Sequence, residues 1–484
     1  MGKTLTLAPV SRIEGHLQIR VQLDDAGNVA DTKVQVVNLR GFEEFAKGRP
    51  VEEMPRITTS ICGVCPSSHH MASVKAVDKC FGVEPTEAGK KQRELMEHAH
   101  FVEEHILHFY FLAGADFVMG PGASVKDRNI FGIIKKMPNE AKLVVKARWA
   151  ASQVAEMVGG RSIHPVAGVP GGWSKPLRSD QVEKCKKHAD LMLEIAKFSI
   201  KYAKENIFPK YQDAIKTIGD IKTGFLGTVA RDGSGAMDLY DGKARMMKAD
   251  GEYREFEYDN YMDEIREHIE PWTYLKFPYD VKAGGFSLDY KNPKGTYRTN
   301  TLARMNVIDK IRTPLANAEF LEFRKKFGRP AQHTLLYHYA RLIELLYAAE
   351  YVRELLNDKD MTNPDTRAKV TGTRAARGVG VVEAPRGTLI HDYTTDDKGL
   401  VTECNLIVGT THNNAAINMS VRQTADALIK GGKYDGAIMN MLEMAIRAYD
   451  PCISCATHNL DGTVAMGVEV YDHKGRLQKR LRNY

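Results

Sequence analysis

Four of the seven cysteines occur as two pairs in which two residues separate the thiols. Cys62 and Cys65 form the first pair, and Cys452 and Cys455 form the second, near the opposite end of the chain. Because two cysteines at this spacing can reach one metal ion from a single turn, the pairs together predict a four-thiolate site that joins the two chain ends. Soft thiolates select zinc, copper(I), iron–sulfur clusters or nickel.

Three kinds of site fit these cysteines. A structural zinc site is the first, although the two pairs of a zinc ribbon usually lie much closer together in the sequence. A redox-active dithiol formed by one pair alone is the second, and a catalytic metal cluster is the third. Histidines follow both pairs, at His69 and His458. The choice between a zinc site, a redox dithiol and a catalytic cluster therefore depends on the residues around the cysteines.

The segments that contain the cysteines resemble two motifs of the large subunit of nickel–iron hydrogenases. Cys62–His69 is similar to the family's CGxCxxxH motif, and Asp450–His458 is similar to its DPCxxCxxH motif. Other segments resemble further family motifs in the same order along the chain: RIEGH at 12–16, RGxE at 40–43, GGRxxHP…PGG at 159–173 and APRG at 384–387. The resemblance favours the catalytic cluster. The related quinone-binding subunit of respiratory complex I lacks the four cysteines.

Two departures from the family pattern indicate a subgroup. Ser60 stands where many members have arginine, and Glu103-Glu104-His105 stands where many have HDH. At both positions the sequence resembles that of cytoplasmic multi-subunit enzymes. The most similar type is the methyl-viologen-reducing enzyme of methanogens, which partners heterodisulfide reductase. The alternatives are the same chemistry coupled to a deazaflavin or NAD(P), or a non-catalytic, zinc-stapled scaffold of a redox complex. No Walker A or Rossmann glycine motif supports nucleotide binding by this chain itself.

The resemblance implies roles for the cysteines. Cys62 and Cys452 would be terminal ligands of nickel, whereas Cys65 and Cys455 would bridge nickel to an iron that carries carbon monoxide and cyanide. Cleaving H₂ also needs a base, which by resemblance is the Cys452 thiolate. Glu14 would carry the proton onward. Without the motif, Glu14 is simply a paired surface carboxylate on a strand.

The resemblance also implies catalytic and cofactor-binding residues around the centre. Pro385 and Arg386 would lie over the iron, with the guanidinium near the cyanides. Asp450 and Glu104 would complete the polar surroundings, and His69 would bond to the sulfur of Cys65. Outside this context, the arginine would be an ordinary turn residue, and Glu104 and His69 would be ordinary residues on helix faces.

Two further sites follow from the same resemblance. Glu43, His458 and the backbone carbonyl of Leu406 resemble the family's magnesium site, a ligand set that suits a hard octahedral ion. His164 resembles a histidine beside the nearest iron–sulfur cluster of the partner subunit. Its ordinary interpretation is a histidine that stabilises a glycine-rich turn.

The remaining cysteines do not provide a second cluster. Cys80, Cys185 and Cys404 show no paired spacing, so each is expected to be a buried free thiol. Iron–sulfur clusters are therefore expected only in partner subunits. By resemblance, the partners are a small subunit with iron–sulfur clusters, a further electron-transfer subunit, heterodisulfide reductase and a maturation protease.

Composition excludes several classes of protein. The chain has 484 residues and a net charge of +7, too little for a dedicated nucleic-acid binder. No run approaches roughly 18 apolar residues, so no membrane span is expected. No secretory signal is recognisable, and sparse cysteines favour a reducing compartment. We therefore expect a cytoplasmic location.

The hydrophobic pattern predicts a mainly α fold with peripheral β pieces (α+β), which agrees with the hydrogenase large-subunit fold. Strands are expected in the first forty residues and over 370–412, with loops and short strands over 220–310. Long helices are expected over 86–112, 139–157, 180–207 (capped by Asp180), 332–356 and 421–448, the last interrupted at Gly431-Gly432. By resemblance, residues 1–458 form one catalytic domain, and residues 459–484 form a maturation peptide. The sequence of this peptide predicts a strand pair with a turn at His473-Lys474-Gly475.

Overall fold

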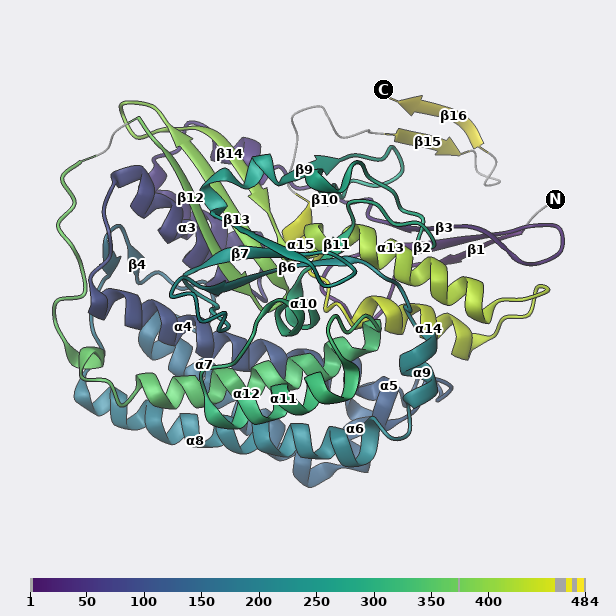
Figure 1. Ribbon diagram of the computed structural model, residues 1–484, viewed down its shortest axis with the longest axis horizontal. Coiled ribbons are helices and arrows are strands. Elements are labelled where there is room, and N and C mark those ends of the chain that lie inside the picture. The colour runs from purple at the N-terminus through teal and green to yellow at the C-terminus, as the bar shows by residue number, and fades with distance from the viewer. Residues whose placement is uncertain (1–2, 373–374, 458–466, 472–476, 483–484) are drawn as a thin grey trace.

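The computed structural model describes residues 3–372, 375–457, 467–471 and 477–482. Long helices lie along one side of the molecule, and small sheets lie along the other (Figure 1). This arrangement confirms the expected helical core with strands near the N-terminus and in the last third of the chain. In the described ranges, no helix is long and apolar enough to cross a membrane.

Four long helices form the helical side. They are α4 (Glu87–Ile106), α7 (Pro138–Gly159), α8 (Ser179–Tyr202) and α12 (Tyr337–Leu355). Both α7 and α12 pack against α4 and α8, so the four build one bundle (Figure 1). Because α12 is buried around nearly its whole circumference, it forms the centre of the bundle.

The start of α8 differs from the expectation. The helix begins at Ser179, and Asp180 lies inside its first turn rather than at the cap. The side chain of Gln181 instead accepts the backbone N–H of Arg178 at 3.0 Å. Asp180 pairs with the guanidinium of Arg178, the residue before the helix, at 2.9 Å.

The last long helix is confirmed as interrupted, because α13 (Gly409–Leu428) and α14 (Gly436–Arg447) are separate. However, α13 begins inside the stretch expected to be strand and turn. Its first turns carry buried threonine, histidine and asparagine side chains, so no apolar stripe marks them in the sequence. In the described part of the chain, three other helices of eight or more residues were missed by the periodicity: α3 (Pro66–Phe81), α10 (Asn300–Val307) and α11 (Pro314–Phe327).

A three-stranded antiparallel sheet packs on α3. Its strands are β12 (Arg377–Ala384), β13 (Gly387–Thr395) and β14 (Val401–Ile407). Ala384 pairs directly with Gly387, so the two residues between them form a tight turn at the end of the β12–β13 hairpin. This turn is the segment that carries Pro385 and Arg386.

Two further sheets flank the core. The N-terminal sheet has the order β1 (Thr4–Leu7), β2 (Gln18–Leu23), β3 (Val29–Gln35). The central sheet has the order β11 (Tyr297–Arg298), β6 (Gly224–Ala230), β7 (Gly242–Met247), β8 (Tyr253–Phe256). The remaining helices and strands are α1 (Phe42–Ala46), α2 (Met54–Ile57), α5 (Gly114–Val118), α6 (Ile130–Lys136), α9 (Gln212–Thr217), α15 (Ile453–Ala456), β4 (Gly168–Val169), β5 (Gly172–Trp173), β9 (Ile265–His268) and β10 (Phe277–Asp280).

The C-terminal strand pair is confirmed. The strands β15 (Gly467–Tyr471) and β16 (Leu477–Arg482) pair in antiparallel orientation. The turn expected between them, at 473–475, lies outside the described residues.

Candidate metal centre

The two cysteine pairs meet in the interior of the molecule. The Sγ atoms of Cys62 and Cys452 lie 3.3 Å apart, as do those of Cys65 and Cys455. All four sulfurs lie within 4.8 Å of one another, and all four side chains are buried. Within the described ranges, no other group of histidine, cysteine or acidic side chains has comparable metal-binding geometry. The spacing prediction of one four-thiol cluster is therefore confirmed.

Backbone geometry positions the first pair. Cys62 follows a 3-10 turn, Thr58–Ile61, and Cys65 precedes the first turn of α3. The Sγ atom of Cys62 accepts the backbone N–H groups of Val64 and Cys65 at 3.2 and 3.3 Å. Hydrogen bonds from the other cluster thiols, first among them Cys452, hold the pKa of the Cys62 thiol well below its ordinary value.

The second pair is held by the N-terminal segment and by α13. The backbone of Glu14 forms a parallel bridge with Cys452, and the N–H of Ile453 donates to the carbonyl of Glu14 at 3.1 Å. The backbone N–H of Cys452 donates to Oγ1 of Thr410 at 2.8 Å. Burial raises the pKa of the Cys452 thiol well above its ordinary value. A metal ion that displaces this proton offsets the cost of burying the thiolate.

The carboxylate of Glu14 lies at the edge of the cluster. Its Oε2 accepts the backbone N–H of Ser454, between the second pair of cysteines, at 3.0 Å. Gly15 allows this close approach, because its φ is +77° and an added Cβ would lie 2.7 Å from Cβ of Ile453. Glu14 is half-buried, so it lies between the buried sulfurs and the exterior.

A buried charge cluster adjoins the sulfurs. Nη1 of Arg386 lies 2.5 Å from Oε2 of Glu104, and Nη2 lies 3.2 Å from Oδ1 of Asp450. Although burial opposes the guanidinium charge, Asp450 and Glu104 raise the pKa of Arg386 well above its ordinary value. Burial raises the pKa of Glu104 to about 8, against the attraction of Arg386. Glu104 is therefore buried and is not a solvated residue on a helix face. The structure brings Arg386, Glu104 and Asp450 together, as expected.

His69 is buried in a hydrogen-bonded chain. Its Nδ1 lies 3.1 Å from Nε2 of His391, and Nδ1 of His391 lies 2.6 Å from the hydroxyl of Tyr393. These partners fix the orientation of the His69 ring. Its bond to the sulfur of Cys65 stays a prediction.

Two of the three expected magnesium ligands lie together. Oε1 of Glu43 accepts the backbone N–H of Leu406 at 2.8 Å, and both residues are buried. The third residue, His458, lies outside the described residues. The complete ligand set therefore stays a prediction.

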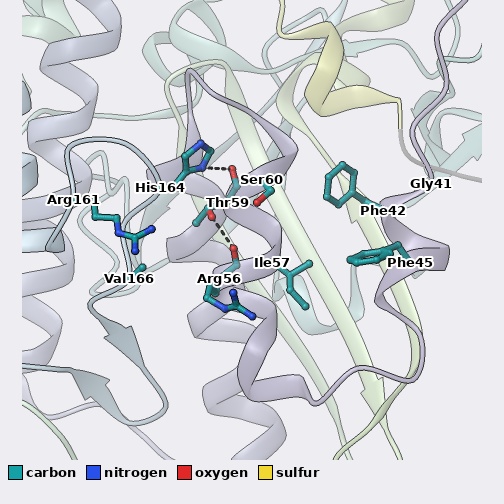
Figure 2. Close-up of a pocket in the computed structure, with 10 residues that line it drawn as sticks. All are labelled: Gly41, Phe42, Phe45, Arg56, Ile57, Thr59, Ser60, Arg161, His164 and Val166. Atoms are coloured by element: carbon teal, nitrogen blue, oxygen red, sulfur yellow. Dashed lines mark hydrogen bonds between the residues drawn. The ribbon is translucent and has the colours of Figure 1, made fainter.

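An open cavity of about 780 Å³ lies beside the segment that leads into the first cysteine pair, and Figure 2 shows the residues that line it. Its wall includes Ser60, two residues before Cys62, and the side chains of Phe45 and Arg161. His164 also lines it, and its Nδ1 lies 3.0 Å from the carbonyl oxygen of Thr59. The expected histidine therefore lies near the cysteine loop, on a surface with half-exposed apolar side chains.

Sequence reasoning missed two residues that hold the centre together. Arg40 donates to the backbone carbonyls of Ile61, Ser60 and Ser454, which joins the two cysteine loops. Thr410 is the other, through its bond to Cys452. Arg40 belongs to the RGxE segment, but its acceptors are backbone atoms and leave no trace in the side-chain pattern.

The chain is similar to known proteins over its whole length. A family described as "Nickel-dependent hydrogenase" matches residues 40–129 and 301–458, and one described as "HoxL-like" matches 4–39. One subunit of the F420-non-reducing hydrogenase of Methanothermobacter thermautotrophicus is 45% identical over 99% of both chains. The beta subunit of the NAD-reducing hydrogenase HoxS of Cupriavidus necator is 36% identical over 99% of both. The solved structure of an "NAD+-reducing [NiFe]-hydrogenase in the H2-reduced state" has a TM-score of 0.89 and 37% identity, and the match covers 94% of this chain and 99% of that one.

Proposed function

The chain belongs to the nickel-dependent hydrogenases, and from this premise we propose how its own residues serve the oxidation of H₂. The family resemblance of the motifs is confirmed, including the likeness to the methyl-viologen-reducing, F420-non-reducing type. The observation that carries the proposal is the group of four buried cysteine sulfurs within 4.8 Å of one another. Four thiolates suit a nickel–iron centre, because soft sulfur ligands favour late transition metals.

The division of ligand roles follows the family resemblance, with Cys62 and Cys452 as terminal nickel ligands and Cys65 and Cys455 as bridging ligands. The sulfurs lie close enough to share one centre, because Cys62–Cys452 and Cys65–Cys455 are each 3.3 Å apart and Cys452–Cys455 are 2.7 Å apart. When bound, the centre supplies the redox chemistry of H₂ cleavage, with carbon monoxide and cyanide on the iron. A zinc staple would also fit four thiolates. It would give no role to a guanidinium buried beside them with two carboxylates.

The proton leaves the site through the protein. The Cys452 thiolate accepts it, and the Glu14 carboxylate takes it next and releases it toward the exterior. The support is local geometry: Glu14 lies against the Cys452 backbone, and its carboxylate is half-buried. Arg386, with Pro385 beside it, would offer a fixed cationic donor to the anionic ligands of the iron. Glu104 and Asp450 hold that guanidinium, and His69 orients the Cys65 sulfur.

A magnesium ion is proposed at Glu43, the carbonyl of Leu406 and His458. The first two lie together in the interior, and a mixed set of carboxylate, carbonyl and imidazole suits a hard divalent ion. Its role would be structural, because it would tie α1 and β14 to the segment after the second cysteine pair.

Electrons leave through a partner. The names of the relatives imply a multi-subunit enzyme with a small subunit. We propose that an iron–sulfur small subunit docks on the cavity beside Ser60, with His164 near its closest cluster, and that further subunits pass electrons to heterodisulfide reductase. The relatives named F420-non-reducing argue against a deazaflavin acceptor, whereas the relative at 36% identity keeps NAD as the alternative. A cytoplasmic location stays a prediction.

The tail provides a direct prediction. We propose that residues 1–458 are the catalytic domain and that a maturation protease removes 459–484 once nickel is bound. Intact-mass spectrometry of the chain isolated with its complex should give a mass that ends at His458. The same measurement on cells grown without nickel should give the full-length chain. An identical full-length mass in both samples, with nickel bound in the first, would contradict the proposal.

Infrared spectroscopy tests the function itself. The anaerobically purified complex should show one carbonyl band and two cyanide bands, and it should reduce methyl viologen with H₂. Zinc in place of nickel, with none of these bands in a chain that ends at His458, would favour the zinc-stapled scaffold.

A further inference from the structure

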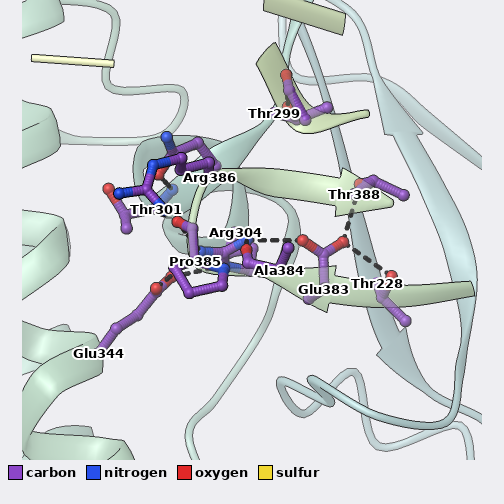
Figure 3. Close-up of polar contacts among 12 residues, drawn as sticks. Thr228, Thr299, Thr301, Arg304, Glu344, Glu383, Ala384, Pro385, Arg386 and Thr388 are labelled. Atoms are coloured by element: carbon purple, nitrogen blue, oxygen red, sulfur yellow. Dashed lines mark hydrogen bonds and ion pairs between the residues drawn. The ribbon is translucent and has the colours of Figure 1, made fainter. Parts of the chain in front are cut away.

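A second cluster of buried charges lies behind the turn that carries Arg386, and none of its members has a part in the chemistry above. It consists of Arg304 on α10, Glu344 on α12 and Glu383 on β12, all fully buried (Figure 3). Nε and Nη2 of Arg304 each lie 2.7 Å from one carboxylate oxygen of Glu344. Nη1 lies 2.6 Å from Oε2 of Glu383. The Arg304 guanidinium is thus bound by Glu344 on one side and by Glu383 on the other.

Stability alone accounts poorly for such a cluster. Removing three charges from water costs several kcal/mol per ion, and apolar side chains of similar size often stabilise a core equally well. Both carboxylate oxygens of Glu383 have hydrogen-bond partners, because its Oε1 accepts the hydroxyl groups of Thr228 at 2.8 Å and of Thr388 at 2.9 Å. A fully bonded cluster of this kind fixes one geometry of the chain.

The geometry that it fixes is the turn before Arg386. Besides its two carboxylates, Arg304 donates to the backbone carbonyls of Ala384, at 3.0 Å, and Pro385, at 3.2 Å. These are the two residues immediately before Arg386. One guanidinium therefore holds the backbone from which the Arg386 side chain extends.

The opposite side of the same turn is also confined. Gly387 has a φ of +131°, and an added Cβ would lie 2.2 Å from Oγ1 of Thr299. Nδ2 of Asn413 lies 3.4 Å from the carbonyl oxygen of Arg386. With Arg304 on one side and these residues on the other, the turn has little freedom to shift.

The cluster also reaches the carboxylate that binds the Arg386 side chain. Oε2 of Glu344 lies 3.1 Å from Nε2 of His105, and His105 directly follows Glu104 on α4. Two consecutive residues of α4 therefore contact the Arg386 region: Glu104 binds the guanidinium, and His105 binds the cluster behind it. Helix α4 therefore contacts the Arg386 guanidinium through Glu104, and through His105 it contacts the cluster that holds the Arg386 backbone.

We propose that Arg304 is a positioning residue for Arg386, and that the Glu344–Arg304–Glu383 cluster sets where the Arg386 guanidinium lies relative to the four-sulfur site. The inference rests on the proposed function, because it takes Arg386 to face the anionic ligands of the iron. A displacement of about 1 Å at such a donor can cost about 10²-fold in rate.

The test compares two buried arginines. Arg304→Lys keeps the positive charge but lacks the planar fork that bonds two carboxylates and two carbonyls at once. Arg298→Lys is the matched control, because Arg298 is also fully buried and flanks α10, but donates to Thr223 and to the carbonyl of Gln332 at 2.7 Å each. Glu344→Gln is a second test variant, which keeps the shape of the side chain and removes its charge.

The readouts are the cyanide bands of the metal-loaded complex and the rate of H₂-dependent methyl viologen reduction. We expect both Arg304→Lys and Glu344→Gln to shift the cyanide bands and to lower the rate about 10²-fold, whereas Arg298→Lys leaves the bands in place. Unchanged bands in the two test variants, or an equal shift in Arg298→Lys, would overturn the proposal. Failure of both test variants to fold, while the control folds, would also overturn it in favour of a structural role. Wild-type complex without bands would instead reject the proposed function.

Discussion

Replacing Cys452 with serine is expected to abolish nickel binding and all H₂-dependent methyl viologen reduction. A serine hydroxyl is a hard, protonated oxygen at neutral pH, and it cannot replace a soft thiolate next to nickel. Cys452 lies 3.3 Å from the sulfur of Cys62 and 2.7 Å from that of Cys455. Its loss therefore opens the middle of the cluster rather than its edge. Metal analysis of the purified complex gives the nickel and iron content directly.

The matched control is Cys80→Ser. Cys80 is as buried as Cys452, but its sulfur lies 3.9 Å from the carbonyl oxygen of Tyr393, outside the four-sulfur group. The control should keep nickel, iron and most of the activity, although it can lower the melting temperature. Nickel and activity retained in Cys452→Ser would refute the four-thiolate site. Equal metal loss in both variants would show a folding defect instead.

The motifs allowed most of the centre to be predicted, because their residues contact one another through side chains. The meeting of Cys62 with Cys452, and of Arg386 with Asp450, follows from residues of the matching motifs, whereas Glu104 was placed by its position in the segment that departs from HDH. The residues that hold these groups were not predicted. Thr410 acts through a backbone N–H, and Arg304 acts through two backbone carbonyls. Every residue offers such groups, so their partners have no sequence signature.

The limits of the fold prediction have a similar cause. The sequence pattern revealed the bundle helices, because α4, α7 and α8 each have an apolar face and α12 is buried around nearly its whole circumference. It missed the start of α13, where Thr410, His412 and Asn413 are all buried. Buried polar side chains at the start of a helix hide it from the periodicity, which expects buried positions to be apolar. They are present here because this helix begins against the Arg386 turn, where Gly409 packs on the Arg386 carbonyl.

Replacing Glu14 with glutamine should lower H₂-dependent methyl viologen reduction by about 10²- to 10⁴-fold while leaving the metal centre intact. Glutamine keeps an oxygen that can accept the N–H of Ser454, and the backbone carbonyl still accepts the N–H of Ile453. The loop around the cysteines therefore keeps its support. Only the ability of the side chain to take up and release a proton is lost, because a glutamine amide does not titrate near neutral pH. Nickel content and the infrared bands should equal those of the wild type.

Two further variants separate proton transfer from packing. Glu14→Asp retains a carboxylate on a shorter side chain, so it should recover part of the lost rate. Glu350→Gln is the matched control, since Glu350 is also half-buried and accepts the backbone N–H groups of Leu315 and Ala316, at 3.0 and 2.8 Å, away from the centre. It should keep the wild-type rate. A wild-type rate in fully loaded Glu14→Gln would exclude this carboxylate from the proton path, whereas loss of nickel in that variant would make Glu14 a structural support of the cysteine loop. Because Glu14 touches the backbone of Cys452 and is half-buried, we expect the rate to fall while the metal stays.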